Sequence, residues 1–291
     1  MTFLPPKLYA KISYEYFTGK KLNLDHPEEF NAKIYWYKVF YHPKILNVLV
    51  DKYAVKEFVK QKIGEQYLNE TYAVYDKAED VNFEELPNKF VIKGVHASGY
   101  NLIVEDKSTL NIEKVTRLFK KWQRNNQYYR TGQEWAYKDV APRIMAEKFM
   151  DQGDGNNSLI DYKFYCFNGE VKFVEVHLDR VSQHKRGFYD LDFNKLPFRY
   201  VSLKKSISEP IDKPSNYDEM IKLSRVLSKD FPFVRVDFYS IQGKTVFGEM
   251  TFYPSDGRKD FIPEEYNKII GDYFTLPKIP EGEQEIKKWN C

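Results

Sequence analysis

Two segments in the second half of the chain each predict a β-hairpin, and they constrain the fold more than any other feature. In 161–180, DYKFYCFNGEVKFVEVHLDR, two β-rich runs flank an Asn-Gly pair, which is the dipeptide most typical of a two-residue hairpin turn. In 233–254, FVRVDFYSIQGKTVFGEMTFYP, polar and apolar residues alternate on both sides of a turn near Gln242 and Gly243. Both segments favour an antiparallel sheet.

The remaining segments mix helical and strand patterns. Apolar residues recur at helical spacing, or nearly so, in four segments, namely 30–40, 51–63, 111–125 and 216–231. Short β-rich runs predict a strand near 71–81, a strand–loop–strand over 88–106 and a strand over 142–150. Because hairpins are interspersed with helices, the order predicts an α+β fold rather than a doubly wound parallel sheet.

Composition excludes several classes of protein. The net charge is only +3, from 45 basic and 42 acidic residues, so we expect no nucleic-acid partner. The two cysteines, Cys166 and Cys291, supply neither a disulfide framework nor zinc-ligand spacing. The first residues lack the apolar run of a signal peptide, and no stretch is apolar enough to span a membrane. A cytoplasmic location is expected.

The second hairpin carries two acidic residues, Asp237 and Glu249, at comparable distances from its turn. Strand alternation places Arg235 and Asp237 on one face, and Glu249 and Thr251 together on the return strand. Two carboxylates side by side repel each other unless a cation lies between them, and hard oxygen ligands suit Mg²⁺. The alternative is that both acids are solvated on an exposed face.

Lys93 ends a buried-type strand and precedes a loop of small residues, GVHASGYN. Small residues such as Ser98 and Gly99 let backbone N–H groups approach an anion, and His96 lies in the same loop. The loop matches neither GxxxxGK[ST] nor GxGxxG. The segment is therefore either a phosphate-binding hairpin or a hairpin with a surface lysine.

Further charged residues lie on or beside the other strands. Glu147 precedes a polar loop, where backbone groups can meet an adenine edge. Four basic residues are candidates to surround a phosphate or an anionic substrate, namely Lys163, Arg180, Arg186 and Arg235. The alternative for each of them is a solvated surface charge. No HExxH, no GxSxG and no cysteine nucleophile context is present.

Taken together and in order, these segments resemble the ATP-grasp superfamily, and within it the TupA-like branch named for teichuronopeptide biosynthesis. The resemblance spans nearly the whole chain, and the matching segments are LNLDHPEEFNAKIYWYK, Asp51-Lys52, FVIKGVHASGYNLIV, RIMAEKFM, DYKFYCFNGEVKFVEVHLDR and VRVDFYSIQGKTVFGEMTFYPSDG. It implies two α+β lobes whose antiparallel sheets clasp MgATP, preceded by a short helical segment. The expected divisions are 1–50, 51–145 and 146–291.

The resemblance also implies roles for individual residues. Lys93 matches the phosphate-binding lysine, and 94–101 matches the phosphate flap that contains His96, Ser98 and Gly99. The adenine hinge corresponds to Glu147, Lys148 and Phe149, and Asp161 would lie near the ribose or phosphates. The positions that face the γ-phosphate and acceptor are Lys163, Arg180 and Arg235. Asp237 and Glu249 match the metal carboxylates, while Thr251 stands where the superfamily usually has asparagine.

The implied activity is an ATP-dependent carboxylate–amine ligase that forms an acyl phosphate, with ATP and Mg²⁺ as cofactors. By analogy it joins an amino acid or amine to a sugar acid in cell-surface polysaccharide biosynthesis. Only about 50 residues precede Asp51, so we expect the loop 181–215 to help build the acceptor site. Two alternatives stay open: a kinase of a sugar or polymer hydroxyl on the same fold, and a glycosyltransferase-like or nucleotide-binding assembly protein.

Overall fold

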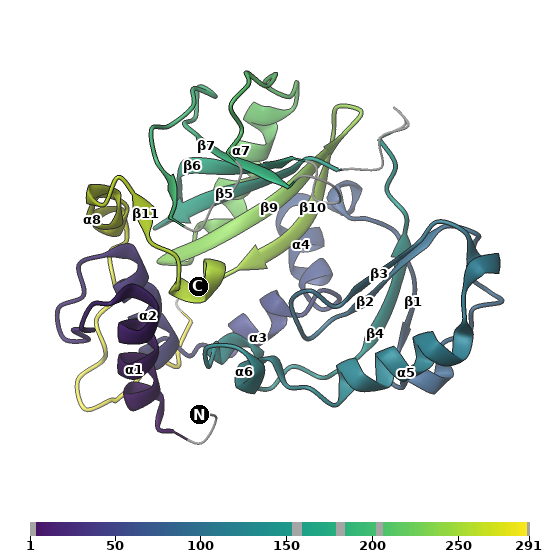
Figure 1. The fold of residues 1–291 in the computed structure, drawn as a ribbon, viewed down its shortest axis with the longest axis horizontal. Helices are drawn as coiled ribbons and strands as arrows, with labels where there is room; N and C mark the ends of the chain where they lie inside the picture. The colour runs from purple at the N-terminus through teal and green to yellow at the C-terminus, as the bar shows by residue number, and fades with distance from the viewer. Residues whose placement is uncertain (1–3, 153–158, 179–183, 202–205, 290–291) are drawn as a thin grey trace. The chain divides into compact units, whose positions relative to one another are not determined.

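The computed structural model of the protein describes residues 4–152, 159–178, 184–201 and 206–289. The chain divides into two compact units (Figure 1). One unit is formed by 45–151, and the other combines 1–44 with 152–291. Residues 1–44 therefore belong to the same unit as the two predicted hairpins.

The unit formed by 45–151 contains a four-stranded antiparallel sheet in the order β1-β4-β2-β3. Its strands are β1 (Thr71–Tyr75), β2 (Phe90–Gly94), β3 (Asn101–Val104) and β4 (Ile144–Lys148). Its helices are α3 (Ile45–Val50), α4 (Val55–Ile63), α5 (Ile112–Gln123) and α6 (Gln127–Arg130). The strand–loop–strand expected over 88–106 is confirmed, because β2 and β3 pair.

Helix α5 buries one stripe of apolar residues in the core of this unit. Val115, Phe119 and Trp122 pack with Phe90 and Ile92 of β2. Asn111 caps the start of the helix, since its side-chain oxygen accepts a hydrogen bond from the backbone N–H of Lys114 at 2.9 Å. The apolar spacing and the cap together explain why this charged segment is helical.

The other unit contains a five-stranded antiparallel sheet in the order β10-β9-β5-β6-β7. Its strands are β5 (Asp161–Phe167), β6 (Glu170–Leu178), β7 (Lys185–Tyr189), β9 (Phe233–Ile241) and β10 (Lys244–Thr251). A separate ribbon pairs β8 (Arg199–Tyr200) with β11 (Phe261–Ile262). Its helices are α1 (Pro6–Thr18), α2 (Phe30–Phe40), α7 (Tyr217–Ser228) and α8 (Glu265–Tyr273).

Both predicted hairpin turns are confirmed. Asn168 and Gly169 have φ of 50° and 81°, and Gln242 and Gly243 have φ of 51° and 77°. Two consecutive positive φ values are the signature of the type I′ turn, whose twist matches that of the strands it joins. Local turn chemistry thus determines where the chain reverses direction between β5 and β6 and between β9 and β10.

The two faces of the five-stranded sheet differ in polarity. Helix α7 packs on one face (Figure 1), where the ring centroids of Phe164 and Tyr217 lie 5.8 Å apart and Val236 and Phe238 are fully buried. The opposite face carries charged residues that the sequence analysis selected on β5, β9 and β10, among them Lys163, Asp237 and Glu249. Apolar burial against α7 therefore directs those charges to the other side of β5 and β9.

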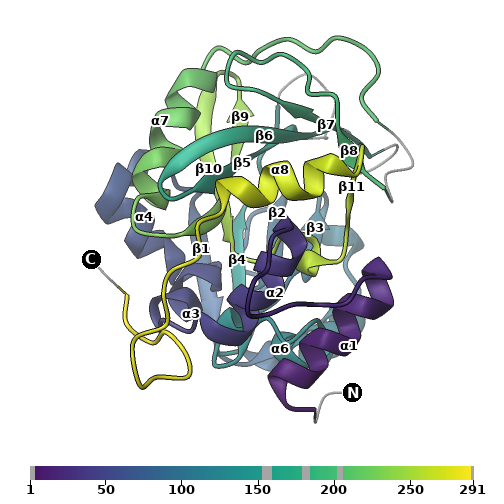
Figure 2. The ribbon, with the colours of Figure 1, turned by 90° about the vertical axis from the view of Figure 1, so that its left-hand side faces the viewer.

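Helices α1, α2 and α8 are grouped beside one end of this sheet (Figure 2). Phe30 at the start of α2 contacts Phe167 and Phe233, with ring centroids 6.0 and 5.2 Å apart. The backbone of α8 approaches the residues before α2 so closely that a Cβ on Gly271 would lie 2.1 Å from the carbonyl oxygen of Glu28. Glycine at this position allows α2 and α8 to pack.

We expect the Gly271→Ala substitution to destabilise this unit. The added methyl group cannot fit without moving backbone, and overpacking of this kind costs about 3 kcal/mol in the free energy of unfolding. Thermal and denaturant unfolding measure the change, with the exposed Lys268→Ala in the same helix as the control. Equal stability of the two variants would contradict the tight α2–α8 approach.

Candidate active site

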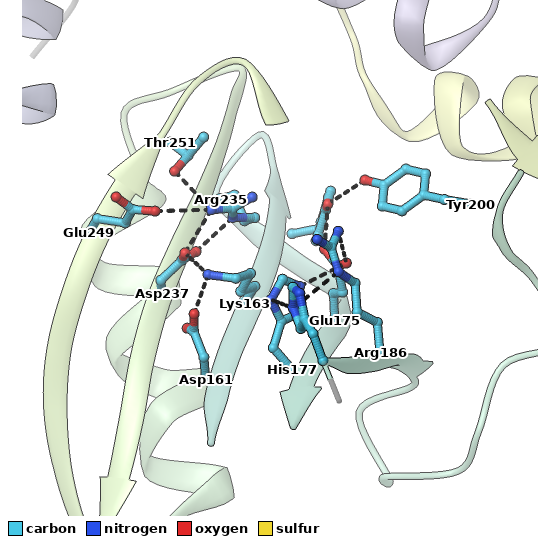
Figure 3. Close-up of polar contacts among 12 residues, drawn as sticks. Asp161, Lys163, Glu175, His177, Arg186, Tyr200, Arg235, Asp237, Glu249 and Thr251 are labelled. Atoms are coloured by element: carbon cyan, nitrogen blue, oxygen red, sulfur yellow. Dashed lines mark hydrogen bonds and ion pairs between the residues drawn. The ribbon is translucent and has the colours of Figure 1, made fainter. Parts of the chain in front are cut away.

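The polar face of the five-stranded sheet carries a row of charged residues in one cross-strand register (Figure 3). Glu249 of β10 lies opposite Asp237 of β9, Asp237 lies opposite Lys163 of β5, and Lys163 lies opposite Glu175 of β6. Residues directly opposite in an antiparallel pair share a face of the sheet. The row thus brings together three of the residues predicted from the sequence and adds Glu175.

A β-bulge in β10 produces the pairing of the two acids. Regular pairing from the turn, as at Phe238 and Phe247, would place Gly248 opposite Asp237. The register instead shifts between Phe247 and Glu249, so that Glu249 faces Asp237. A Cβ on Gly248 would lie 3.0 Å from the carbonyl oxygen of Asp237, which explains why glycine occupies the bulge.

Asp237 is buried and receives two cations. Arg235 binds it in a bidentate manner, with Nε 2.7 Å from Oδ1 and Nη2 2.7 Å from Oδ2. Lys163 forms a short ion pair with Oδ2 of Asp237 and a second one, at 2.6 Å, with Asp161. Since a buried carboxylate is costly without partners, these contacts stabilise Asp237 in place.

The three predicted metal ligands fit a cation. The Nη2 atom of Arg235 lies 2.7 Å from Asp237 Oδ2, 3.3 Å from Glu249 Oε1 and 3.0 Å from Thr251 Oγ1. Three oxygen atoms therefore converge on one positive group. Two carboxylates and a hydroxyl are hard oxygen donors of the kind that Mg²⁺ takes alongside substrate phosphates.

The groups around Asp237 carry more negative than positive charge. Burial raises the pKa of Asp237 to about 6, although Arg235 and Lys163 both lower it, and the anionic Asp161 and Glu249 raise it further. Three carboxylates thus face two cations at this end of the row. A further cation would offset the remaining negative charge. Among the described residues, no group of three or more His, Cys, Asp or Glu side chains forms a metal site.

The β6–β7 end of the row is built around Glu175. Its Oε1 lies 2.9 Å from His177 Nε2 and 3.6 Å from Arg186 Nη1, and its Oε2 accepts a hydrogen bond of 3.1 Å from the Tyr165 hydroxyl. Tyr165 in turn contacts the Tyr200 hydroxyl at 2.7 Å. Glu175 is therefore held from three sides.

Burial lowers the pKa of His177 to about 4, although Glu175 raises it, so the imidazole is uncharged at neutral pH. Burial by itself raises the pKa of Glu175, but His177, Arg186 and Arg235 together hold it below its usual range. Since His177 carries no charge at pH 7, it acts on Glu175 at that pH through their close contact at 2.9 Å, while the two arginines supply the positive charge. The sequence analysis did not select Glu175.

The unit formed by 45–151 contains a second buried carboxylate with two cations. Glu147 Oε2 lies 2.6 Å from the Lys93 ammonium, and Oε1 lies 2.5 Å from the Lys56 ammonium. Although burial raises the pKa of Glu147, Lys93 and Lys56 reverse the effect and hold it below its usual value. Sequence reasoning missed Lys56, which reaches Glu147 from α4.

Apart from Asp161 on β5, the other described residues expected to bind nucleotide lie in or beside the same sheet. The His96 ring is buried, with Nε2 3.0 Å from the Trp122 carbonyl oxygen. The Ser98 carbonyl accepts a hydrogen bond from Arg130, and Gly99 has φ of 77°. Lys148 is exposed and Lys89 lies over the Phe149 ring at 5.9 Å. Arg180 lies outside the described residues.

Comparison with known proteins identifies the family. A family model described as TupA-like ATPgrasp matches residues 32–275. The chain belongs to the TupA-like ATP-grasp family. The resemblance stated from the motifs is confirmed, together with the α+β ATP-grasp fold. No curated protein matches the sequence significantly, and in the described part of the chain no helix has the length and apolarity to cross a membrane.

Solved structures of ATP-grasp enzymes also match this TupA-like chain. The D-alanine–D-alanine ligase of Bacillus anthracis complexed with ATP is 17% identical over 72% of this chain and 55% of the ligase, with a TM-score of 0.41. The ligase PsnB complexed with minimal precursor is 9% identical over 72% and 54%, with a TM-score of 0.39. The ADP complex of purK is 10% identical over 72% and 46%, with a TM-score of 0.41. The chain thus spans about half the length of these three proteins.

We expect the Lys56→Met substitution to lower the free energy of unfolding by about 2 kcal/mol at pH 7, because Glu147 loses a charged hydrogen-bond partner. The pKa of Glu147 is lower in the folded protein than its unfolded value of about 4.3. The contribution is therefore present above about pH 5 and is lost as the pH falls through the folded pKa.

Chemical denaturation at a series of pH values measures this effect. The difference between wild type and Lys56→Met should be largest near neutrality and should shrink in acid. The matched control is Lys60→Met, since Lys60 lies in the same helix but is exposed and pairs with Glu65. A difference that does not depend on pH would show that Lys56 acts through packing and its hydrogen bonds to Asn69 and Thr71 rather than through the charge of Glu147.

Proposed function

We propose that this protein is an ATP-dependent carboxylate–amine ligase that acts through an acyl phosphate. The observation that carries the proposal is the convergence of Asp237, Glu249 and Thr251 on one cationic nitrogen, in the same register row as Lys163. Membership of the ATP-grasp family supports an ATP-dependent enzyme. The formation of a C–N bond and the nature of both substrates are parts of the proposal.

Each unit supplies its own group of residues. Lys93, held by Glu147, would donate to the ATP phosphates, while the backbone of 94–101 would approach them. The hinge residues Glu147, Lys148 and Phe149 would lie nearest the adenine, and Asp161 nearest the ribose or phosphates. Asp237, Glu249 and Thr251 would hold Mg²⁺, which offsets the charge on the phosphate oxygens when it is bound.

The proposed chemistry has two steps. An oxygen of the acid's carboxylate attacks the γ-phosphorus, the bond from phosphorus to the β,γ-bridging oxygen breaks, and ADP leaves with the electron pair. An amine then attacks the acyl carbon, the carbon–oxygen bond to phosphate breaks, and inorganic phosphate and one proton are released. Lys163 and Arg235 would stabilise the transferring phosphoryl group. Little covalent chemistry is required of the protein itself.

The proposed substrates follow the branch to which the chain belongs. A sugar acid would provide the carboxylate and an amino acid or other amine would provide the nucleophile, in the biosynthesis of a cell-surface polysaccharide. The cationic end of the polar face, with Arg186 beside Glu175, supports an anionic acceptor.

We expect Glu249→Gln to reduce turnover by at least about 100-fold, because it removes a charged ligand of the metal. The side chain is partly exposed, so the fold should remain intact. The assay is release of ADP and phosphate in the presence of an acid and an amine together. Glu170→Gln is the control, since Glu170 is an exposed glutamate on β6 that pairs with Arg225. Near-normal turnover of Glu249→Gln would remove Glu249 from the metal site.

The products separate the rival functions. A ligase releases ADP and free phosphate only when both substrates are present. A kinase would release ADP and retain phosphate on a stable product. A glycosyltransferase-like protein would be stabilised against heat by a UDP- or GDP-sugar rather than by MgATP.

A further inference from the structure

Charge is divided unequally along the polar row. At the β9–β10 end, three carboxylates face two cations, and the set comprises Asp161, Asp237, Glu249, Lys163 and Arg235. At the β6–β7 end, the carboxylate among the described residues is Glu175, which pairs with Arg186, and Lys259 lies over the Tyr200 ring of the same cluster. One end therefore has an excess of negative charge and the other an excess of positive charge. These excesses suit a metal ion at one end and an anion at the other.

Lys259 is half-buried and has no carboxylate in ion-pair contact among the described residues. Its ammonium lies 5.9 Å from the centroid of the Tyr200 ring. Burial lowers the pKa of Lys259, the Arg186 charge lowers it further, and Glu175 opposes this. The same tyrosine links Lys259 to the Glu175 cluster, because the Tyr200 hydroxyl lies 2.7 Å from the Tyr165 hydroxyl, which donates to Glu175 at 3.1 Å.

Helix α2 positions this lysine. Asn31, which is buried, donates hydrogen bonds to the Lys259 carbonyl oxygen at 2.9 Å and to Asp260 Oδ1 at 2.7 Å. On the other side, Val201 donates its backbone N–H to the Asp260 carbonyl at 2.9 Å. The backbone that carries Lys259 is therefore held in place before any ligand binds. Binding of an anion by this lysine therefore requires no ordering of its backbone.

We infer that Arg186 and Lys259 bind the carboxylate of the acid substrate. This inference rests on the proposed ligase function. Neighbouring strands lie about 4.7–4.9 Å apart, so the β6 end of the row is roughly 10 Å from Asp237 and roughly 14 Å from Glu249. The transferring phosphoryl group and the attacking carboxylate fit within this span. Lys163 lies between the two ends and faces both Asp237 and Glu175.

The same geometry disfavours an α-amino acid as the acid substrate. Its ammonium group would need a carboxylate near Arg186, and among the described residues the carboxylate that pairs with Arg186 is Glu175. Both oxygens of Glu175 are already engaged, Oε1 by His177 and Arg186 and Oε2 by Tyr165. The site therefore takes an acid without an ammonium group beside its carboxylate, which leaves an amino acid the role of the amine.

The test measures binding of D-glucuronate and of its uncharged analogue D-glucuronamide by calorimetry, with the full chain saturated with magnesium and a non-hydrolysable ATP analogue. D-Glucuronate should bind at millimolar concentration, D-glucuronamide should bind at least about tenfold more weakly, and L-alanine should not compete. Arg186→Met and Lys259→Met should each weaken D-glucuronate binding roughly tenfold or more. Lys259→Arg, which keeps the positive charge, should retain most of the wild-type affinity for D-glucuronate.

Lys185→Met is the matched control. Lys185 precedes Arg186 on β7, so its side chain lies on the opposite face, where its nearest carboxylate is the exposed Glu209. This control should bind D-glucuronate as the wild type does. The nucleotide affinity of every variant should be unchanged, which also shows that each variant is folded.

Three outcomes would overturn the inference: no D-glucuronate binding by the wild type, equal binding of the acid and the amide, or unaltered binding in Arg186→Met and Lys259→Met. Failure of the proposed function would look different, because the ATP analogue itself would not bind. The D-glucuronate titration is therefore repeated without nucleotide. In the titrations without nucleotide, weaker D-glucuronate binding by Arg186→Met and Lys259→Met still shows whether these two residues form a carboxylate site.

Discussion

The ion pairs of Asp237 with Arg235 and Lys163 are the interaction on which the polar face depends. A buried carboxylate that loses a cationic partner is strongly destabilising, and both partners come from strands, Arg235 from β9 itself and Lys163 from β5. Strand pairing therefore determines the spacing of the charged groups. The same pairing aligns Glu249 and Glu175 with Asp237 in one row, so the candidate site is a property of the sheet rather than of its loops.

The unit formed by 45–151 also pairs a buried carboxylate with two cations. Glu147 is buried between Lys56 and Lys93, just as Asp237 is buried between Lys163 and Arg235. A phosphate group that attracts Lys93 leaves Glu147 still paired with Lys56, so the exchange exposes no unpaired buried charge. Two cations on one carboxylate thus allow one of them to change partners at low cost. In both units a buried carboxylate therefore keeps one cationic partner if the other cation turns to a ligand.

Local sequence was sufficient for the hairpins, because turn chemistry and two-residue alternation act over a few positions. It placed Arg235 with Asp237 and Glu249 with Thr251. It was insufficient for Glu175, because a bulge between Tyr165 and Cys166 shifts the β5–β6 register by one residue. Regular pairing from the turn would have put Val174, not Glu175, opposite Lys163. Lys56 and Lys259 depend on helix packing and long-range contacts, which no local pattern encodes.

The division of charge along the row also bears on the choice between a carboxylate and a hydroxyl acceptor. A hydroxyl group must lose its proton to attack phosphorus, and that requires a base. The carboxylate at the acceptor end, Glu175, is occupied by His177, Arg186 and Tyr165, and it is held in its anionic form by cations that lower its basicity. A carboxylate acceptor is already ionised at neutral pH and needs cations rather than a base. In the proposed site Arg186 and Lys259 would provide those cations, which supports the proposed acyl-phosphate formation over phosphorylation of a sugar hydroxyl.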